Sequence, residues 1–180
     1  MSKIGKKNIT VPKESSIKID GSNLTFTGPK GSKVLSINDK IFSSTLKENE
    51  FQILPVDKKI DKKTSIMWGT YRSLINNAVK GVSTGHEKIL ELNGVGFRAN
   101  IKGEKLNLQI GFSHDVNFSI PKEVKITVEK QILIKITGVD KDLVSKIAAD
   151  IKNLKPVEPY KGKGIKERGQ FVLRKEGKKK

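Results

Sequence analysis

The sequence predicts an α+β protein made of two tandem related modules, each a small antiparallel β-sheet packed against one long helix. Three observations predict this class. A pattern of residues near the N-terminus recurs in the second half of the chain. Each half also contains one long stretch with apolar residues at helical spacing. The remaining segments are short, alternate apolar and polar residues, and are separated by glycine-containing turns, as in antiparallel hairpins.

The internal repeat defines the two modules. Val11-Pro12-Lys13-Glu14 recurs as Ile120-Pro121-Lys122-Glu123, and the two alternating segments that follow also match. Residues 17–20 and 24–28 correspond to residues 126–129 and 134–138, with one inserted residue in the second turn. A match that covers a motif and two successive strands indicates two related units.

The first module is predicted to begin with a β-hairpin. Its strands, 16–20 and 23–27, are joined through Asp20-Gly21, which is a strong signal for a tight hairpin turn. A turn at Gly28-Pro29-Lys30-Gly31 then leads to further strands at 33–37 and 50–56.

Residues 59–79 are predicted to form the helix of the first module. Apolar residues at spacings of three, four and seven place one apolar face on this helix, comprising Ile60, Met67, Tyr71, Leu74, Ile75 and Ala78. Gly81 is the expected stop of the helix, and residues 82–85 are expected to link the two modules.

The second module is predicted to contain strands at 88–92, 97–101 and 105–110, followed by the repeated strand pair. Its helix is expected at 140–154, with Asp140 as the N-cap and an apolar face of Leu143, Ile147, Ile151 and Leu154. Pro156 prevents the helix from continuing. The predicted domains are therefore residues 1–82, residues 83–155, and a basic loop and tail at 156–180.

The charge of the chain points to a polyanionic partner. The formal net charge is +17 and the pI is about 9.9. Residues 1–13 and 155–180 together carry 11 of these 17 charges, so the body of the chain is nearly balanced. Basic ends on a balanced body suggest arms that reach nucleic acid, with an anionic membrane surface as the second possibility. Because only four of the basic residues are arginine, the composition favours contact with phosphates over reading of base edges.

The composition gives no support for an enzyme. The chain has no cysteine, which excludes disulfides, thiolate zinc sites and thiol catalysis. The two histidines, His86 and His114, lack the partners of a nucleophilic triad or a metal site, so no cofactor and no metal are expected. The sequence shows no membrane span and no signal-peptide core, and we expect a soluble protein of the cytoplasm. Gly94-Val95-Gly96 is interpreted as a tight turn, because a strand and not a helix follows it.

The segment from Tyr160 to Gly164 is the strongest candidate for binding. Lys161-Gly162-Lys163-Gly164 alternates cations with glycines that allow close approach of the backbone, and Tyr160 supplies a ring that can stack on an unpaired base. A solvated, flexible turn is the alternative interpretation. On the first helix Arg72 shares a polar face with Asn76 and Lys80; a solvated face is the main interpretation there, and a phosphate contact from Arg72 is the other.

The chain also resembles the L-six family of bacterial large-subunit ribosomal proteins over essentially its whole length. The most specific match is Glu158-Pro159-Tyr160-Lys161-Gly162-Lys163-Gly164-Ile165. Supporting stretches occur in the same order as in the family, at residues 1–6, 28–31, 72–77, 94–99 and 111–114. Val157 stands where the family commonly has proline.

The resemblance implies a structural constituent of the large ribosomal subunit that binds 23S ribosomal RNA near the docking site of translation factors. Neighbouring ribosomal proteins would be its other partners, and it would have no enzymatic activity. A basic nucleic-acid-binding protein outside the ribosome is the alternative. The candidate RNA-binding residues are Tyr160, Lys161, Gly162, Lys163, Gly164, Lys166, Arg174, Lys175, Lys178 and Lys179, with Lys3, Lys6, Lys7 and Arg72.

We expect residues 158–165 to form an anchored loop that presents Tyr160, Lys161 and Lys163 at a fixed angle. The residues after this loop are expected to form a separate and less specific electrostatic extension.

Overall fold

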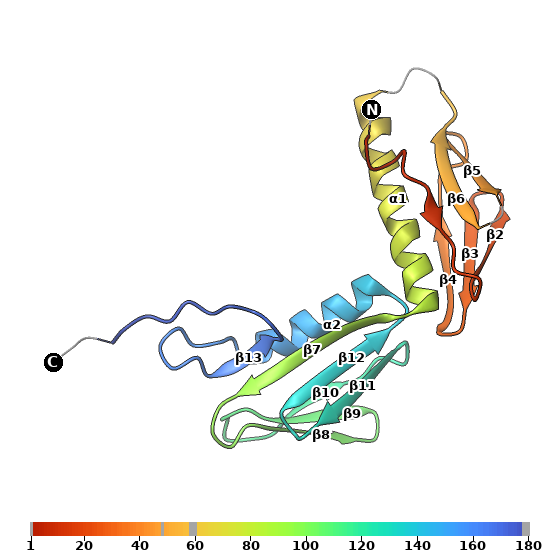
Figure 1. Ribbon diagram of the computed structural model, residues 1–180. Coiled ribbons are helices and arrows are strands. Elements are labelled where there is room, and N and C mark those ends of the chain that lie inside the picture. Colours follow the sequence, from red (N-terminus) through yellow and green to blue (C-terminus); the bar gives the residue numbers. More distant parts are fainter. Residues whose placement is uncertain (1, 48, 58–60, 178–180) are drawn as a thin grey trace. The chain divides into compact units, whose positions relative to one another are not determined.

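The computed structural model describes residues 2–47, 49–57 and 61–177. Two compact units make up the chain: unit 1 comprises Met1–Gly85 and Val139–Lys141, and unit 2 comprises His86–Gly138 and Asp142–Lys180. Each unit combines small antiparallel sheets with one helix (Figure 1), which confirms the predicted α+β class. Neither helix in the described part of the chain is long and apolar enough to cross a membrane.

Unit 1 contains two three-stranded sheets and α1 (Lys62–Ser83). In the first sheet the order is β2 (Ser16–Asp20), β3 (Asn23–Gly28) and β4 (Gly31–Ser36). In the second the order is β1 (Ile9–Thr10), β6 (Glu50–Pro55) and β5 (Phe42–Lys47). Helix α1 lies against β3, β4 and β6, so one helix contacts both sheets (Figure 1).

Helix α1 follows the prediction at its centre and departs from it at both ends. Ile75 and Ala78 of the expected apolar face are buried, whereas Ile60 lies outside the described residues. The expected stop at Gly81 is wrong, because α1 continues to Ser83. The reason is tertiary: the Lys30 N–H donates to the Val82 carbonyl at 3.1 Å, and the buried Val82 side chain belongs to the core of unit 1. The turn between β3 and β4 therefore packs against the last turn of the helix.

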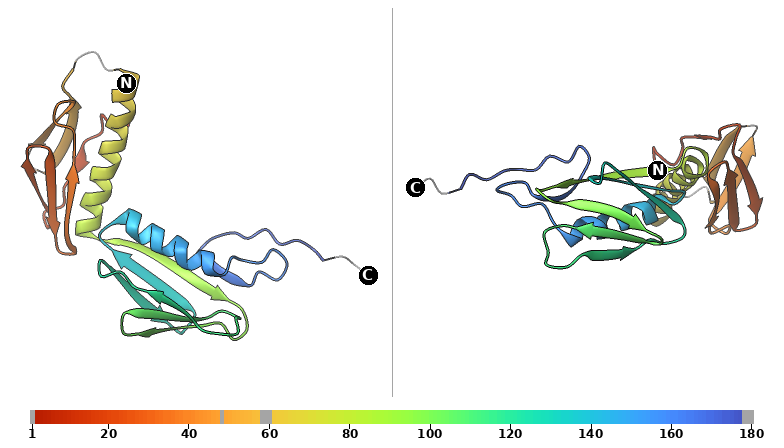
Figure 2. Two further views of the ribbon diagram at one scale, coloured as in Figure 1. Left: turned by 180° about the vertical axis from the view of Figure 1, so that it is seen from behind. Right: turned by 90° about the horizontal axis from the view of Figure 1, so that it is seen from below.

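Unit 2 contains a four-stranded sheet, a three-stranded sheet and α2 (Lys141–Leu154). The larger sheet has the order β11 (Val124–Glu129), β12 (Leu133–Gly138), β7 (His86–Asn93) and β13 (Gly164–Glu167). The smaller has the order β10 (Val116–Ser119), β9 (Lys105–Gln109) and β8 (Arg98–Lys102). Helix α2 runs along the larger sheet (Figure 2), and its buried residues Val144, Ile147 and Ile151 join the core of the unit.

The internal repeat is reproduced in the pairing of strands. In β2–β3 Ile17 faces Phe26 and Ile19 faces Leu24, and in β11–β12 the corresponding pairs are Ile126 with Ile136 and Val128 with Ile134. The predicted Asp20-Gly21 hairpin is confirmed, with Gly21 at a φ of 56°. The inserted residue of the second copy lies in a longer loop, where Lys130 and Gln131 both take positive φ values.

The sequence did not resolve the division of each unit into two sheets. It also did not indicate the short strands β1, β5, β10 and β13. Strand β5 consists largely of serine and threonine around Phe42 and Leu46, and β13 has only four residues, so neither carries a clear alternating pattern. These strands exist because a neighbouring strand supplies their hydrogen bonds.

Candidate nucleic-acid interface

Strand β13 ties the candidate RNA-binding segment to the core of unit 2. It pairs antiparallel with β7, from Gly164 opposite Asn93 to Glu167 opposite Leu90. The side chain of Ile165 is fully buried, and its N–H donates to the Lys155 carbonyl at 2.9 Å. The chain thus leaves α2, forms a loop and returns to a position beside its own starting point.

The loop between α2 and β13 is closed by its own hydrogen bonds. The Glu158 N–H donates to the Lys163 carbonyl at 2.8 Å, and the Gly162 N–H donates to the Glu158 carbonyl at 3.0 Å. These two bonds close a segment of six residues and satisfy the N–H and C=O groups of Glu158, the N–H of Gly162 and the C=O of Lys163, which would otherwise need water or a partner. The expectation of an anchored loop, rather than a flexible turn, is confirmed.

Two glycines, Gly162 in the loop and Gly164 at the start of β13, are required by the backbone. Gly162 has a φ of 70°, and a Cβ there would lie 3.2 Å from the Arg174 guanidinium. Gly164 has a φ of 139°, and a Cβ there would lie 2.6 Å from the Pro156 carbonyl oxygen. Both residues are buried within unit 2. Close approach of RNA to these two glycines stays a prediction, whereas their role in shaping the loop follows from the geometry.

The loop exposes the three side chains that the sequence singles out. Tyr160 is 54% exposed, and Lys161 and Lys163 are also exposed. Neither lysine forms an ion pair with any residue that the structure describes. Lys166 differs from them, because its ammonium group lies 3.0 Å from the Glu91 carboxylate on the neighbouring strand β7. Its charge is therefore partly neutralised by the protein itself.

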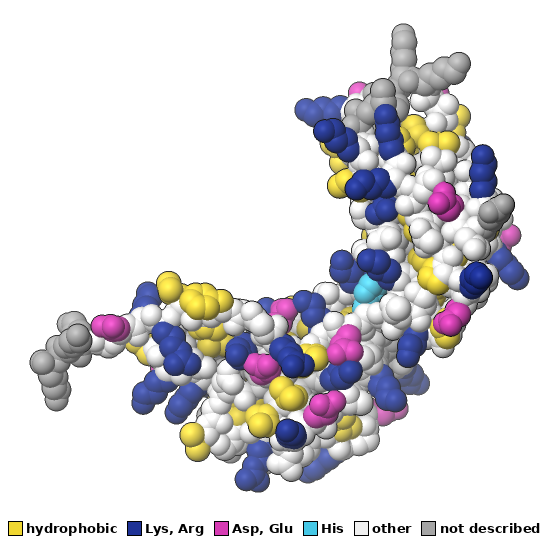
Figure 3. All heavy atoms as spheres, in the orientation of Figure 1, with side chains coloured by type: hydrophobic (Ala, Val, Ile, Leu, Met, Phe, Trp, Pro, Cys, Tyr) yellow, Lys and Arg dark blue, Asp and Glu magenta, His cyan; other side chains and the backbone are white. Residues whose placement is uncertain are grey.

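The segment that follows β13 does not leave the loop at once. The Lys175 N–H donates to the Pro159 carbonyl at 2.9 Å, and the Arg174 guanidinium lies over Gly162. The expectation of a separate extension is therefore wrong for Arg174 and Lys175. Lys178 and Lys179 lie outside the described residues. Figure 3 shows several Lys and Arg side chains on the part of unit 2 from which the C-terminal segment extends.

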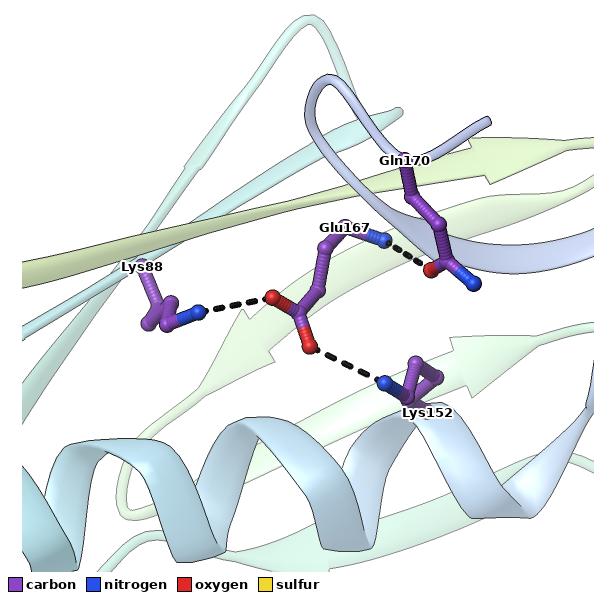
Figure 4. Close-up of polar contacts among 4 residues, drawn as sticks. All are labelled: Lys88, Lys152, Glu167 and Gln170. Atoms are coloured by element: carbon purple, nitrogen blue, oxygen red, sulfur yellow. Dashed lines mark hydrogen bonds and ion pairs between the residues drawn. The ribbon is translucent and has the colours of Figure 1, made fainter. Parts of the chain in front are cut away.

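A carboxylate that the sequence gave no reason to select holds the far end of β13. Glu167 accepts hydrogen bonds from Lys88 on β7 at 2.7 Å and from Lys152 on α2 at 2.9 Å (Figure 4). Gln170 accepts a hydrogen bond from the Glu167 N–H at 3.3 Å. The hydrogen bonds from Lys88 and then Lys152 lower the pKa of the Glu167 carboxyl group. Glu167 therefore connects a strand, a helix and the C-terminal segment.

The N-terminal candidates form a second group, in unit 1. The Arg72 guanidinium donates to the carbonyls of Lys7 and Asn8 at 3.3 and 3.4 Å, so this side chain holds the N-terminal segment against α1. Lys3, Lys6 and Lys7 are exposed around it. The structure thus gives Arg72 a structural role, while contact of these four residues with RNA stays a prediction.

The remaining features of the sequence have structural explanations. Gly94-Val95-Gly96 lies in the turn between β7 and β8, where the Phe97 N–H donates to the Gly94 carbonyl at 3.3 Å, as the interpretation of a tight turn requires. Within the described ranges, no group of three or more His, Asp or Glu side chains is arranged to hold a metal ion.

Comparison with known proteins identifies the family. The family model described as "Ribosomal protein L6" matches residues 11–85 and 93–168. The chain belongs to the ribosomal protein L6 family. The chain is 45% identical to the protein named "Large ribosomal subunit protein uL6" of Phenylobacterium zucineum, 45% identical to that of Caulobacter vibrioides and 42% identical to that of Sphingopyxis alaskensis. Each match covers all 180 residues of this chain and the whole of the relative.

The two matched stretches coincide with the internal repeat of the sequence. The first L6 repeat contains β2 and β3, and the second contains β11 and β12, the strand pairs that share one register. Membership of a ribosomal protein family also confirms the prediction that the chain is not an enzyme. The second repeat extends to Arg168 and so includes the loop, β13 and Glu167.

Glu167→Gln should weaken the anchoring of β13. We expect the free energy of unfolding at pH 7 to fall by roughly 1 kcal/mol, because two partly exposed ion pairs are lost. Because the folded-state pKa of Glu167 is lowered, its contribution is complete above the ordinary glutamate pKa of about 4.3 and is lost as the pH falls through the lowered value. Urea denaturation of both proteins between pH 7 and 2 measures this difference. Glu123→Gln, at an exposed carboxylate, serves as control, and a difference for Glu167→Gln that is independent of pH would contradict the account.

Proposed function

We propose that this chain is a structural constituent of the large ribosomal subunit and binds 23S ribosomal RNA through the loop of residues 158–163 in unit 2. Its membership of the ribosomal protein L6 family supports the ribosomal location. The names of its relatives, which are large-subunit proteins, support it as well. The observation that carries the RNA contact is the closed loop, which exposes Tyr160, Lys161 and Lys163 while two internal backbone hydrogen bonds hold its shape.

The chemistry of the loop suits RNA. Lys161 and Lys163 have no carboxylate partner among the described residues, so their charges are available to phosphates, and counterions are released when they bind. The exposed ring of Tyr160 can stack on a base that is not paired. Because the loop is ordered by its own hydrogen bonds, binding would restrict it little further.

The N-terminal group in unit 1 offers a second contact with RNA. Lys3, Lys6 and Lys7 are exposed on a segment that Arg72 fixes to α1, so their charges have a defined position. Neighbouring large-subunit proteins are the other partners under this proposal. A position near the docking site of translation factors is part of the same proposal, as is a cytoplasmic location within the ribosome. No observation favours the alternative of a basic nucleic-acid-binding protein outside the ribosome.

Sedimentation tests the ribosomal assignment. In a lysate fractionated on a sucrose gradient, the chain should migrate with free large subunits and with intact ribosomes, and it should stay bound to large subunits after a wash at moderate salt. The small subunit provides the control fraction. A chain found mainly in the soluble or nucleoid fractions would contradict the assignment.

Lys161→Ala and Lys163→Ala should each remove one phosphate contact. We expect the slope of log K against log salt for binding to 23S ribosomal RNA to decrease in magnitude by about 0.7–0.9 for each substitution. Filter binding over a series of salt concentrations measures the slope. Lys105→Ala is a matched control, because it removes an exposed lysine that lies outside the loop, at the first residue of β9. Slopes unchanged in both loop variants would mean that the loop does not contact phosphate.

A truncation after Gln170 should weaken RNA binding without unfolding the chain. The chain 1–170 keeps β13, the buried Ile165 and the Glu167 hydrogen bonds, and it loses Arg174 and Lys175. We expect it to remain folded and to bind 23S ribosomal RNA more weakly. The chain 1–154 should instead lose stability in unit 2, because it lacks Ile165 and leaves the edge of β7 unpaired. Circular dichroism and filter binding check both, and equal stability of the two truncations would contradict the role of β13.

A further inference from the structure

A groove beside the RNA-binding loop combines three kinds of surface. It has a volume of about 540 Å³ and is lined by Phe97, Ile110, Gly111, Lys155, Pro156, Glu158 and Lys163. All of these residues belong to unit 2. The lining thus combines apolar residues with two lysines and one acidic residue, Glu158. Sites of this size with a few polar groups suit a single small chemical group rather than an extended surface.

The walls of the groove are held in place by neighbouring contacts. The Lys155 ammonium lies 4.6 Å from the centre of the Phe112 ring, a cation–π contact that fixes its position. The turn that carries Gly111 and Phe112 lies between β9 and β10, where the buried Asn107 donates to Asp115 at 3.2 Å and to Asn117 at 3.1 Å. Both backbone groups of Glu158, another residue of the lining, bond within the loop.

Glu158 distinguishes between two possible occupants of the groove, a phosphate group alone and a whole nucleotide. A groove that contacts only phosphate is expected to be lined by cations alone, since a carboxylate repels a phosphate. Glu158 can only accept hydrogen bonds when ionised, so it favours a group that presents N–H donors. A nucleotide has both features: a phosphate for Lys155 and Lys163, and a base for Phe97 and Pro156 to pack against.

We propose that this groove binds one unpaired guanine of the RNA, with the Glu158 carboxylate accepting from the N–H groups on its Watson–Crick edge. Guanine presents two such donors side by side, whereas the N–H of uracil stands between two carbonyls that a carboxylate repels. Lys155 and Lys163 contact the phosphates on either side of the guanine. This inference rests on the proposed RNA-binding function and adds a base-specific contact to it.

Glu158→Gln gives a test in which the direction of the effect is decisive. The substitution makes the protein more positive, so purely electrostatic binding would strengthen. Loss of a bidentate contact to guanine would instead weaken binding. The backbone bonds of Glu158 remain available in the variant, so the loop keeps its closure. Glu176→Gln is the matched control, because it changes the same charge at an exposed position in the C-terminal segment.

The measurement uses the full chain and two labelled single-stranded RNAs. One RNA consists of seven uridines, and the other is the same oligomer with a guanine at its central position. In fluorescence anisotropy at low salt, the wild type should bind the guanine oligomer roughly five- to 150-fold more tightly, which is the discrimination expected from one bidentate contact. Glu158→Gln should abolish this preference, and Glu176→Gln should keep it. Lys155→Met should weaken binding of both oligomers without changing the preference.

Two results would overturn the proposal: equal affinity of the wild type for both oligomers, or tighter binding of the guanine oligomer by Glu158→Gln. Filter binding of the same proteins to 23S ribosomal RNA separates this failure from failure of the proposed function. Tight binding to that RNA without a guanine preference would refute the guanine site alone. If the wild type binds neither the oligomers nor the ribosomal RNA, both the guanine site and the proposed RNA-binding function are refuted.

Discussion

The antiparallel pairing of β13 with β7 is the constraint on which the candidate site depends. It places the buried Ile165 in the core and brings the end of the loop back to Lys155, beside the end of α2. Both ends of the loop are then fixed within one unit, and two internal hydrogen bonds fix its middle. The conformational entropy that Tyr160, Lys161 and Lys163 lose on being ordered is thus lost during folding. Binding of a partner does not have to order them. Without β13, the same residues would form a mobile basic tail.

The same constraint explains how the two repeats have diverged. In unit 1 the partner of β3 is β4, the next strand in the chain, and β4 forms the edge of its sheet. In unit 2 the partner of β12 is β7, which comes much earlier in the sequence and whose other edge is open to a further strand. Strand β13 occupies that edge. Both units thus contain the repeated strand pair, β2–β3 in unit 1 and β11–β12 in unit 2. Only the sheet of unit 2 adds a further strand, β13, and with it the loop.

Local sequence patterns predicted the parts of this structure that local chemistry determines. The Asp20-Gly21 hairpin, the centre of α1 and the end of α2 at Leu154 follow from turn residues, apolar spacing and a proline. Strand β13 and the Glu167 hydrogen bonds were not predictable in this way. The strand has four residues without alternation, and Lys88 lies 79 residues from Glu167 in sequence. For the same reason the ordering of Arg174 and Lys175 beside the loop was missed, since it depends on a bond to Pro159.

The net charge of the chain does not show which lysines are available to a polyanion, because the fold pairs some of them with carboxylates. Lys88 and Lys152 are paired with Glu167, Lys135 with Glu87 and Lys166 with Glu91, and all these pairs lie in unit 2 around the larger sheet and α2. Lys161 and Lys163 have no such partner in the described part of the chain. Acidic residues in the sheet therefore anchor the framework with some lysines, and the loop exposes others. Under the proposed function, the selectivity of the candidate site would arise from this division and not from the total of positive charge.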